Sequence, residues 1–323
     1  MEIYDTKNRQ RMDWIDAAKG IAAILVVLVH AYAVSAETSS DFLINTVSSL
    51  HNPAFYLCSG ILFSIKGTEK SRMKTFFNKA LDLLLPFAVW CILYSVYAKA
   101  LIHIVKSDYA YSYWNTMNKL WFLPILFFAF CVTMFFEKLH LKTIYAGGIL
   151  AASVITGAFI SSMLAKIACF TFIFYIGTRV KSIGKKKKYI GIFSIVVWSA
   201  VIIVCYMTGL ITQQDNFRAG VKLLIMLVSY IVGAIGFTYV IYSLAEKLPG
   251  YIMKIFQYIG QNTLYIYILH FLFIYYLEIV KCNNIICILC LAAAALIFPI
   301  IFAKSIRGRI VDKILFKPSK IMK

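Results

Sequence analysis

The chain has 323 residues, 61% of them hydrophobic, and a formal net charge of +19. Soluble globular domains contain about 45–50% apolar residues. This composition, with a mean hydropathy of +0.79, therefore excludes a soluble enzyme and predicts an all-α polytopic membrane protein. The eight cysteines lie mostly inside apolar runs and lack metal-ligand spacing, so we expect buried thiols and no metal.

Ten apolar segments follow a polar N-terminal arm at residues 1–12. Their approximate ranges are 15–35, 46–65, 80–105, 119–136, 143–163, 167–180, 189–211, 221–244, 257–280 and 285–303. A helix of about 20 apolar residues crosses a bilayer, and the segment at 167–180 is the shortest. We therefore predict about ten transmembrane helices in a single domain over 13–304, followed by a basic cytoplasmic tail over 305–323.

The basic residues indicate on which side the ends of the chain lie. With ten crossings, 26 of the 33 lysines and arginines fall on the side of the two termini and six on the other, while Lys99 lies inside a segment. An excess of lysine and arginine is typical of cytoplasmic loops, so both termini should be cytoplasmic. The same placement explains the net charge without nucleic acid, which we do not expect as a partner.

The first apolar segment carries two polar residues on one face. It lies within DWIDAAKGIAAILVVLVHAYAVS at residues 13–35, with Lys19 at its entrance and His30 deep inside. Eleven residues make three helical turns plus about 20°, so both side chains share a face, about 16 Å apart along the axis. An imidazole at this depth is costly unless it is paired or faces a wet cavity, which makes it a candidate functional residue. The alternative is a packing histidine that hydrogen-bonds a backbone carbonyl.

Two further histidines, His51 and His270, lie in the segments at 46–65 and 257–280. Their depths are compatible with that of His30, so the three side chains could line one cavity and are candidate catalytic residues. Alternatively, each imidazole could form its hydrogen bonds with groups close to it and have no catalytic role.

Asp16 lies three residues before Lys19 and on the same face of the predicted helix. One interpretation is an ion pair at the helix end, with the lysine reaching toward the headgroups. The other is that the two residues bind a nucleotide-bearing donor arriving from the cytosol, with Lys19 on its phosphates.

Three other residues are candidates for lining a cavity or binding an acceptor. Asn52 precedes Pro53, which frees backbone groups near the start of its segment, and Asn262 lies within the segment at 257–280. Trp121 follows an aromatic connector whose flat faces suit stacking on a sugar, although an interfacial aromatic belt is the commoner reason for such residues.

These residues occur in motifs that resemble those of the membrane-bound acyltransferase-3 family. IDAAKGIAAILVVLVH is similar to the family's opening signature, in which a basic residue precedes a histidine by eleven positions. HNPAFYLCSGILF, KLWFLPILFF and IGQNTLYIYILH resemble its second, fourth and ninth segments, in the same order. There are two departures: Lys19 stands where many members have arginine, and Asp82 stands where a basic residue is common.

The resemblance implies an O-acyltransferase of the stand-alone type, located in the bacterial cytoplasmic membrane. Acetyl-CoA or another acyl-CoA would serve as donor substrate rather than as a permanently bound cofactor. The acceptor would be a hydroxyl of an extracytoplasmic or lipid-linked sugar, as in surface polysaccharide. By position His30 is the catalytic histidine and Lys19 its partner toward the donor. Membrane lipid surrounds the chain, and self-association into a homo-oligomer is compatible with the sequence.

Other functions and mechanisms are also compatible with the sequence. A secondary transporter or flippase for a glycolipid would use the same histidines as a proton relay, although the chain has no visible internal repeat. A catalytically silent scaffold is a third function. Within the acyltransferase hypothesis, direct attack with His30 as general base competes with a transient acyl-histidine.

Overall fold

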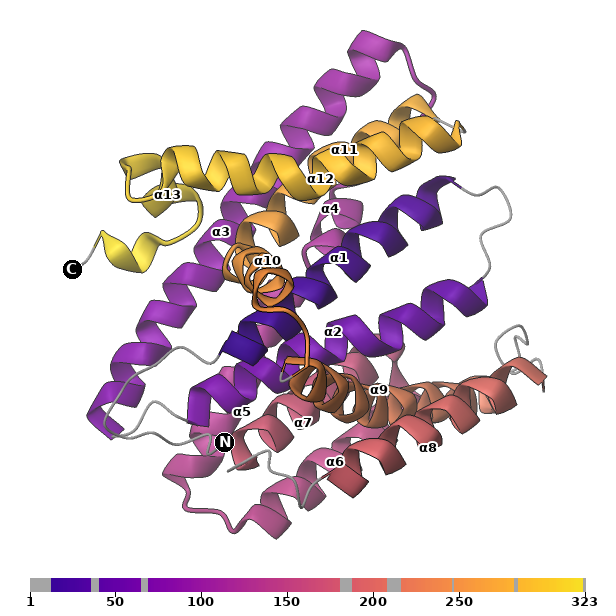
Figure 1. Ribbon diagram of the computed structural model, residues 1–323, viewed down its shortest axis with the longest axis vertical. Helices are drawn as coiled ribbons and strands as arrows, with labels where there is room; N and C mark the ends of the chain where they lie inside the picture. The colour runs from indigo at the N-terminus through magenta and orange to yellow at the C-terminus, as the bar shows by residue number, and fades with distance from the viewer. Residues whose placement is uncertain are drawn as a thin grey trace. The chain divides into compact units, whose positions relative to one another are not determined.

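The structure is a computed structural model that describes residues 13–35, 41–64, 69–180, 188–207, 216–245, 247–281 and 284–321. Within these ranges all regular secondary structure is helical (Figure 1). The predicted N-terminal arm at 1–12 lies outside the described residues. The all-α polytopic membrane fold is confirmed.

Each of the ten predicted segments overlaps a helix, although some ends differ: α3, for example, begins at Glu69 rather than at the predicted residue 80. These helices are α1 (Asp13–Ser35), α2 (Asp41–Ser64), α3 (Glu69–Val105), α5 (Phe122–Lys138), α6 (Thr143–Ile160), α7 (Ser162–Arg179), α8 (Lys188–Met207), α9 (Asn216–Ala245), α11 (Thr263–Val280) and α12 (Ile285–Ile306).

Among the described residues, seven of these helices are long and apolar enough to cross a membrane. An eighth crossing results if α5 and the short α4 (Tyr113–Lys119), which are bent by 55° relative to each other, form one span. The helices α2 and α7 are not among the seven. The first half of α2 is rich in polar residues, and α7 contains Lys166. The number of ten crossings therefore stays a prediction.

The predicted start of the ninth segment at residue 257 is wrong. The chain forms α10 (Gly250–Gln261) and then begins a new helix, α11, at Thr263. Asn262 separates the two, with φ −107° and ψ 11°, which is not helical backbone. The sequence Gly260-Gln261-Asn262 interrupts two apolar stretches, and this interruption marks the break.

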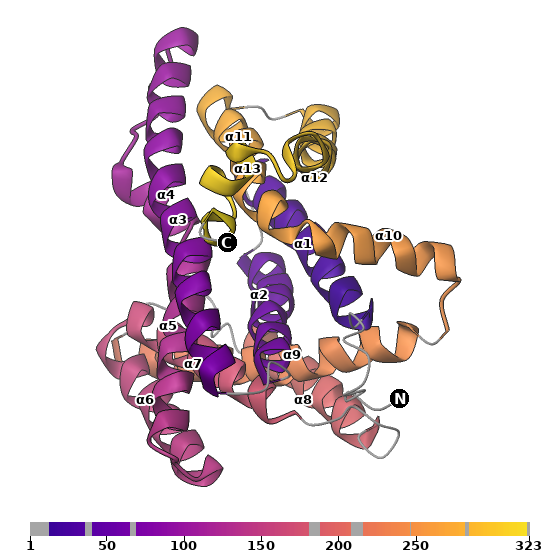
Figure 2. The ribbon, with the colours of Figure 1, turned by 90° about the vertical axis from the view of Figure 1, so that its left-hand side faces the viewer.

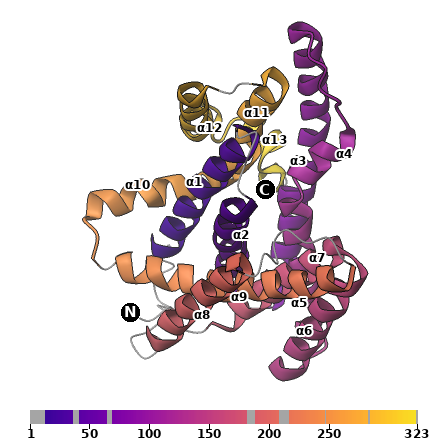
Figure 3. The same ribbon diagram turned by 90° about the vertical axis from the view of Figure 1, so that its right-hand side faces the viewer.

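The chain divides into two compact units. Unit 1 takes in residues up to 22, residues 41–67 and residues 128–261, and unit 2 takes in residues 23–40, 68–127 and 262–323. In unit 1, α7 packs against α2 and α6, while α9 packs against α2 and α8. The pairing of α8 with α9 can be followed in Figure 3.

Two glycines allow a close helix contact in unit 1. A Cβ atom on Gly260 would lie 1.7 Å from the carbonyl oxygen of Asp16, and one on Gly20 would lie 2.0 Å from that of Phe256. The backbones of α1 and α10 are therefore in contact at Gly20 and Gly260, where the helices have no Cβ atom between them. Small residues serve this purpose in membrane helices because they let backbones approach closely.

In unit 2, α3 and α11 lie side by side and run parallel (Figure 2). Three side chains donate hydrogen bonds to carbonyl oxygens of α11; two of them are on α3 and one lies just beyond its C-terminal end. The residue numbers of the donors and of the acceptors increase together, so the two helices are parallel. The bonds run from the Tyr94 hydroxyl to Ile268 (2.6 Å), from the Tyr97 hydroxyl to Leu272 (3.0 Å) and from Ser107 Oγ to Ile279 (2.7 Å). A parallel pair agrees with the alternation of segments, because the third and ninth should cross in the same direction.

The predicted topology can be tested inside unit 2. Asp108 follows the end of α3 with its side chain 80% exposed, and Arg309 follows the end of α12 and is also exposed. Single cysteines at these positions, in a background without the eight native cysteines, should react with an impermeant maleimide from opposite sides of sealed vesicles. Labelling of both from the same side would contradict the topology.

Candidate active site

Two of the predicted histidines meet in unit 2. The ring centroids of His30, on α1, and His270, on α11, are 5.4 Å apart, with 39° between the ring planes. Phe271 packs on both, with its ring centroid 5.4 Å from that of His30 and 4.0 Å from that of His270. Residues 240 positions apart in the sequence thus form one group of rings inside membrane-length helices, in which His270 and Phe271 are fully buried and His30 is half-buried.

The neighbouring backbone orients His270. Its side chain is fully buried, and Nδ1 lies 2.9 Å from the carbonyl oxygen of Ile266, one turn earlier on α11. A carbonyl only accepts, so Nδ1 carries the proton, and Nε2 of the neutral ring keeps its lone pair. Nε2 has no hydrogen-bond partner within the described part of the chain. An unpaired acceptor in a buried position is costly, and such an atom is suited to accept a hydrogen bond from a group that enters the site.

His51 belongs to unit 1. It is 2% exposed, and its Nδ1 lies 2.9 Å from the carbonyl oxygen of Val47, one turn earlier on α2. Its hydrogen bond therefore resembles that of His270. The prediction that all three histidines line one cavity stays a prediction, because His51 is in a different unit from His30 and His270.

Lys19 and His30 project from one uninterrupted helix, as the sequence predicted. Lys19 is half-buried, and Asp16 is 7% exposed. The backbone of Asp16 forms the contact with Gly260, so the start of α1 is held by α10. The roles of both residues toward a donor stay predictions.

The three candidates for an acceptor site have different surroundings. Asn52 is half-buried in α2, and Trp121 lies between α4 and α5 with its ring centroid 6.2 Å from that of Phe122. Asn262 is 1% exposed, and its Oδ1 accepts a hydrogen bond of 2.5 Å from Arg307 Nη2. An acceptor that used Asn262 Oδ1 would have to share it with Arg307.

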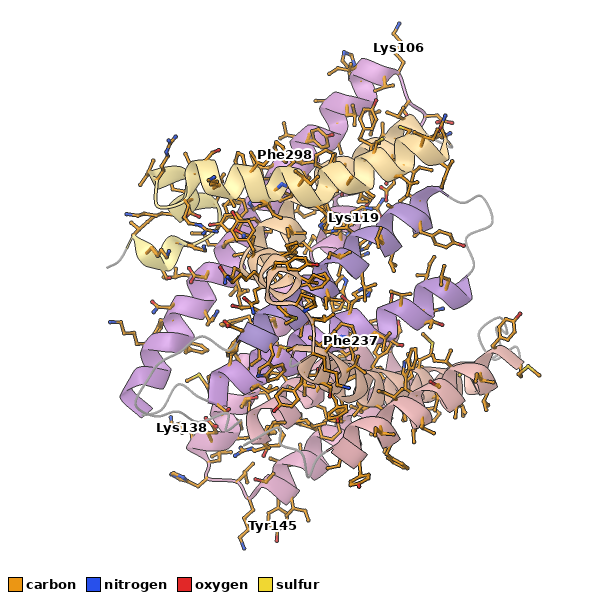
Figure 4. The ribbon with its side chains drawn as sticks, in the orientation of Figure 1. Lys106, Lys119, Lys138, Tyr145, Phe237 and Phe298 are labelled. Atoms are coloured by element: carbon orange, nitrogen blue, oxygen red, sulfur yellow. The ribbon has the colours of Figure 1, made fainter. Side chains whose placement is uncertain are left out.

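An ion pair near the histidines was not predicted from the sequence. Lys119, at the end of α4, pairs with Glu278 in the last turn of α11, and both side chains are mostly buried. The Lys119 ammonium lies 4.9 Å from the centroid of the Tyr275 ring and 5.8 Å from that of Phe271. Lys119 is labelled in Figure 4, as is Lys106, whose side chain points away from the end of α3. The sequence feature that could have indicated this pair is that Lys119 and Glu278 are isolated charges beside apolar runs.

Hydrogen bonds hold the connector after α3 around this ion pair. The Tyr109 hydroxyl donates to Glu278 Oε2 (3.0 Å), and Thr116 Oγ1 pairs with the Tyr275 hydroxyl (2.6 Å). Burial, followed by the negative charge of Glu278, raises the pKa of Tyr109 to about 12, so this hydroxyl stays protonated at neutral pH. The connector is therefore attached to α11 by the bond from Tyr109 to Glu278, and α4 is attached to α11 by the bond between Thr116 and Tyr275.

Membrane-length helices and a pair of imidazoles in contact define a polytopic membrane protein with a polar site inside its helices. A family model described as an acyltransferase domain matches residues 12–304. The chain belongs to this acyltransferase-3 family, and it is a membrane acyltransferase by family. It matches no curated protein and no solved structure.

Proposed function

We propose that the protein transfers an acetyl group from cytoplasmic acetyl-CoA to a hydroxyl of an extracytoplasmic or lipid-linked sugar. The observation that carries the proposal is the His30–His270 pair within a chain of the acyltransferase-3 family. Acyl transfer to a hydroxyl needs a base near the reacting atoms, and the neutral imidazole of the half-buried His30 can serve as one.

In the proposed reaction the sugar hydroxyl attacks the thioester carbonyl while His30 takes its proton. The new bond is the ester C–O bond, and the bond that breaks is the thioester C–S bond. The proton then passes from His30 to the sulfur of the leaving CoA, so the products are an acetylated sugar and free CoA. The role of His270 is to position the imidazole of His30. The Nδ1–H of His270 donates to the carbonyl oxygen of Ile266, and its ring packs beside His30 and Phe271.

The test of the function is acetyl transfer by the purified, full-length protein. Carbon-14 acetyl-CoA is supplied with a panel of methyl glycosides and an undecaprenyl-linked sugar, and ester formation is measured. We expect CoA release to depend on the acceptor. A protein that binds acetyl-CoA but never acetylates a sugar hydroxyl, or that moves a glycolipid without consuming acetyl-CoA, would contradict the proposal.

Lys19→Ala is expected to weaken binding of acetyl-CoA by about tenfold while leaving the KM for the acceptor unchanged. The reason is that a charged hydrogen bond to a phosphate contributes about 1.5–3 kcal/mol. Lys19→Arg keeps the charge and should bind the donor about as well as the wild type. Equilibrium binding of acetyl-CoA checks the prediction, and unchanged affinity in Lys19→Ala would limit Lys19 to a structural ion pair or a headgroup contact.

A further inference from the structure

An apolar groove of about 380 Å³ lies in unit 1 between α5, α6 and α7. Phe128, Ile160 and Leu164 line the groove and are exposed, so it opens on the surface of these helices rather than inside a closed core. A groove of this volume is large enough for a small molecule, and its lining favours an apolar one. An alkyl chain of a membrane lipid has this chemistry.

Thr171 provides an unpaired hydroxyl in the lining of the groove. The two other hydroxyl side chains of the lining, Ser153 and Thr156, donate to backbone carbonyl oxygens of their own helix. Thr171 is 1% exposed, and its Oγ1 has no hydrogen-bond partner within the described part of the chain. An unpaired buried hydroxyl is costly. An acceptor oxygen of a bound molecule, such as an ester carbonyl, would pair with it.

A guanidinium group lies about one helical turn from Thr171. Arg179 is exposed in the last turn of α7, and its guanidinium carbon is 4.7 Å from the centroid of the Tyr175 ring. Thr171, Tyr175 and Arg179 follow one another at intervals of four residues, so they lie along one side of the helix, about 6 Å apart along its axis. The Tyr175 ring also packs edge-on against that of Phe136, which lines the groove. Tyr175 therefore places the charge of Arg179 beside the end of the groove that Phe136 lines.

Two lysines lie near the same end of the groove. Lys138 is in the last turn of α5, two residues after Phe136, and Lys142 is at the N-cap position of α6 (Figure 4 labels Lys138). Both side chains are exposed, and Glu137 is the one acidic residue in the sequence from 128 to 180. The distribution of basic residues predicts that this end of the helices is cytoplasmic, where the leaflet surface is negatively charged.

We propose that the groove binds an anionic phospholipid. An acyl chain of the lipid fills the apolar lining, an ester carbonyl accepts from the Thr171 hydroxyl, and the phosphate contacts Arg179 and the two lysines. The order of these groups along α7 matches their order in the lipid, where the ester lies between the chain and the phosphate. Arg179 offers a planar fork to the phosphate, and the lysines offer point charges.

The test is titration of the delipidated, full-length protein in dodecyl maltoside, with bound lipid measured by native mass spectrometry. Phosphatidylglycerol is the anionic probe, and phosphatidylcholine with the same chains is the reference. We expect tighter binding of phosphatidylglycerol, and a Kd for it that rises about fivefold in Arg179→Gln, the usual contribution of one basic residue at an anionic membrane surface. Lys166→Gln is the matched control, because Lys166 is an exposed lysine near the opposite end of α7, and its Kd should stay within about twofold of wild type.

A second pair of variants tests the groove itself. Ser153 lines the groove and is exposed, so Ser153→Trp occupies the place of the acyl chain without displacing buried atoms. Ala152→Trp is its control, because Ala152 is exposed on the same helix but lies outside the lining. The Kd for phosphatidylglycerol should rise about tenfold or more in Ser153→Trp and stay within about twofold in Ala152→Trp. If Ser153→Trp melts below wild type without lipid, Ser153→Met replaces it with the same expectation.

Thr171→Val tests the ester contact. Valine keeps the shape of threonine and removes the unpaired hydroxyl, so the lipid-free protein should melt at a slightly higher temperature than wild type. The Kd for phosphatidylglycerol should nevertheless rise about three- to tenfold, the usual effect of losing one hydrogen bond. These opposite changes distinguish a hydroxyl that binds a ligand from one that serves only the fold.

Four results would overturn the inference. Equal affinity of the wild type for the two lipids, or equal losses in Arg179→Gln and Lys166→Gln, would show that no phosphate site is present at this end of the groove. Unchanged binding in the Ser153 variants would show that the lipid lies outside the groove. A Thr171→Val protein with unchanged affinity for phosphatidylglycerol would exclude the ester contact.

Discussion

Replacement of His30 by alanine is expected to lower the rate of acetyl transfer by about 10²–10⁴-fold, the usual cost of losing a general base. The side chain that would take the acceptor's proton is then gone, although donor and acceptor can still bind. The ring of His30 contacts those of His270 and Phe271. Its removal therefore leaves a small cavity and should lower the melting temperature only slightly.

Two further variants separate the chemical role of His30 from a packing role. His30→Asn keeps a hydrogen-bonding side chain but cannot accept the proton at neutral pH, so it should be nearly as inactive as His30→Ala. His270→Ala should cost less, because His270 orients the group rather than taking the proton. The measurement is radiolabelled acetyl transfer by purified variants, with thermal melting in parallel. An active His30→Asn protein would exclude general-base catalysis by this residue.

Replacement of Gly260 by valine is expected to prevent the start of α1 from packing correctly. A Cβ there would lie 1.7 Å from the carbonyl oxygen of Asp16 and 2.6 Å from its carbonyl carbon. These are backbone atoms, which cannot rotate away, so α1 and α10 must separate. The cost should reach the upper end of the ~1–3 kcal/mol known for overpacked sites. We expect a lower melting temperature and a smaller yield of monodisperse protein.

Gly148→Val is the matched control for this experiment. Gly148 lies on α6 in the same unit, and a Cβ there would meet no atom within 4 Å. Valine at this exposed membrane position should leave the melting temperature within about one degree of wild type, since surface substitutions are usually within ±0.5 kcal/mol. Equal stability of the Gly260→Val and Gly148→Val proteins would show that α1 and α10 do not need this contact.

Most individual helices could be predicted from the sequence because each depends on local composition. In a membrane every backbone polar group must be paired within the chain, so an apolar run of sufficient length forms a helix wherever it occurs. The spacing of Lys19 and His30 on one face follows from helix geometry alone. The same local argument failed at the ninth segment, because α10 and α11 are both apolar enough to be taken as one helix.

The motifs of α1 and α11 also sufficed to indicate the acyltransferase family, but they could not show which residues meet. The pairing of His30 with His270, the ion pair of Lys119 with Glu278 and the hydrogen bond from Arg307 to Asn262 all join distant parts of the chain. Periodicity reports which face of a helix is polar, and it contains no information about which other helix packs there. Asp82 illustrates the difference. In the sequence it is a departure from the family pattern, whereas in the structure its carboxylate binds Ser319, 237 residues later. The reason is that the tertiary fold packs the short 3-10 helix η2 (Pro318–Lys320) against α3.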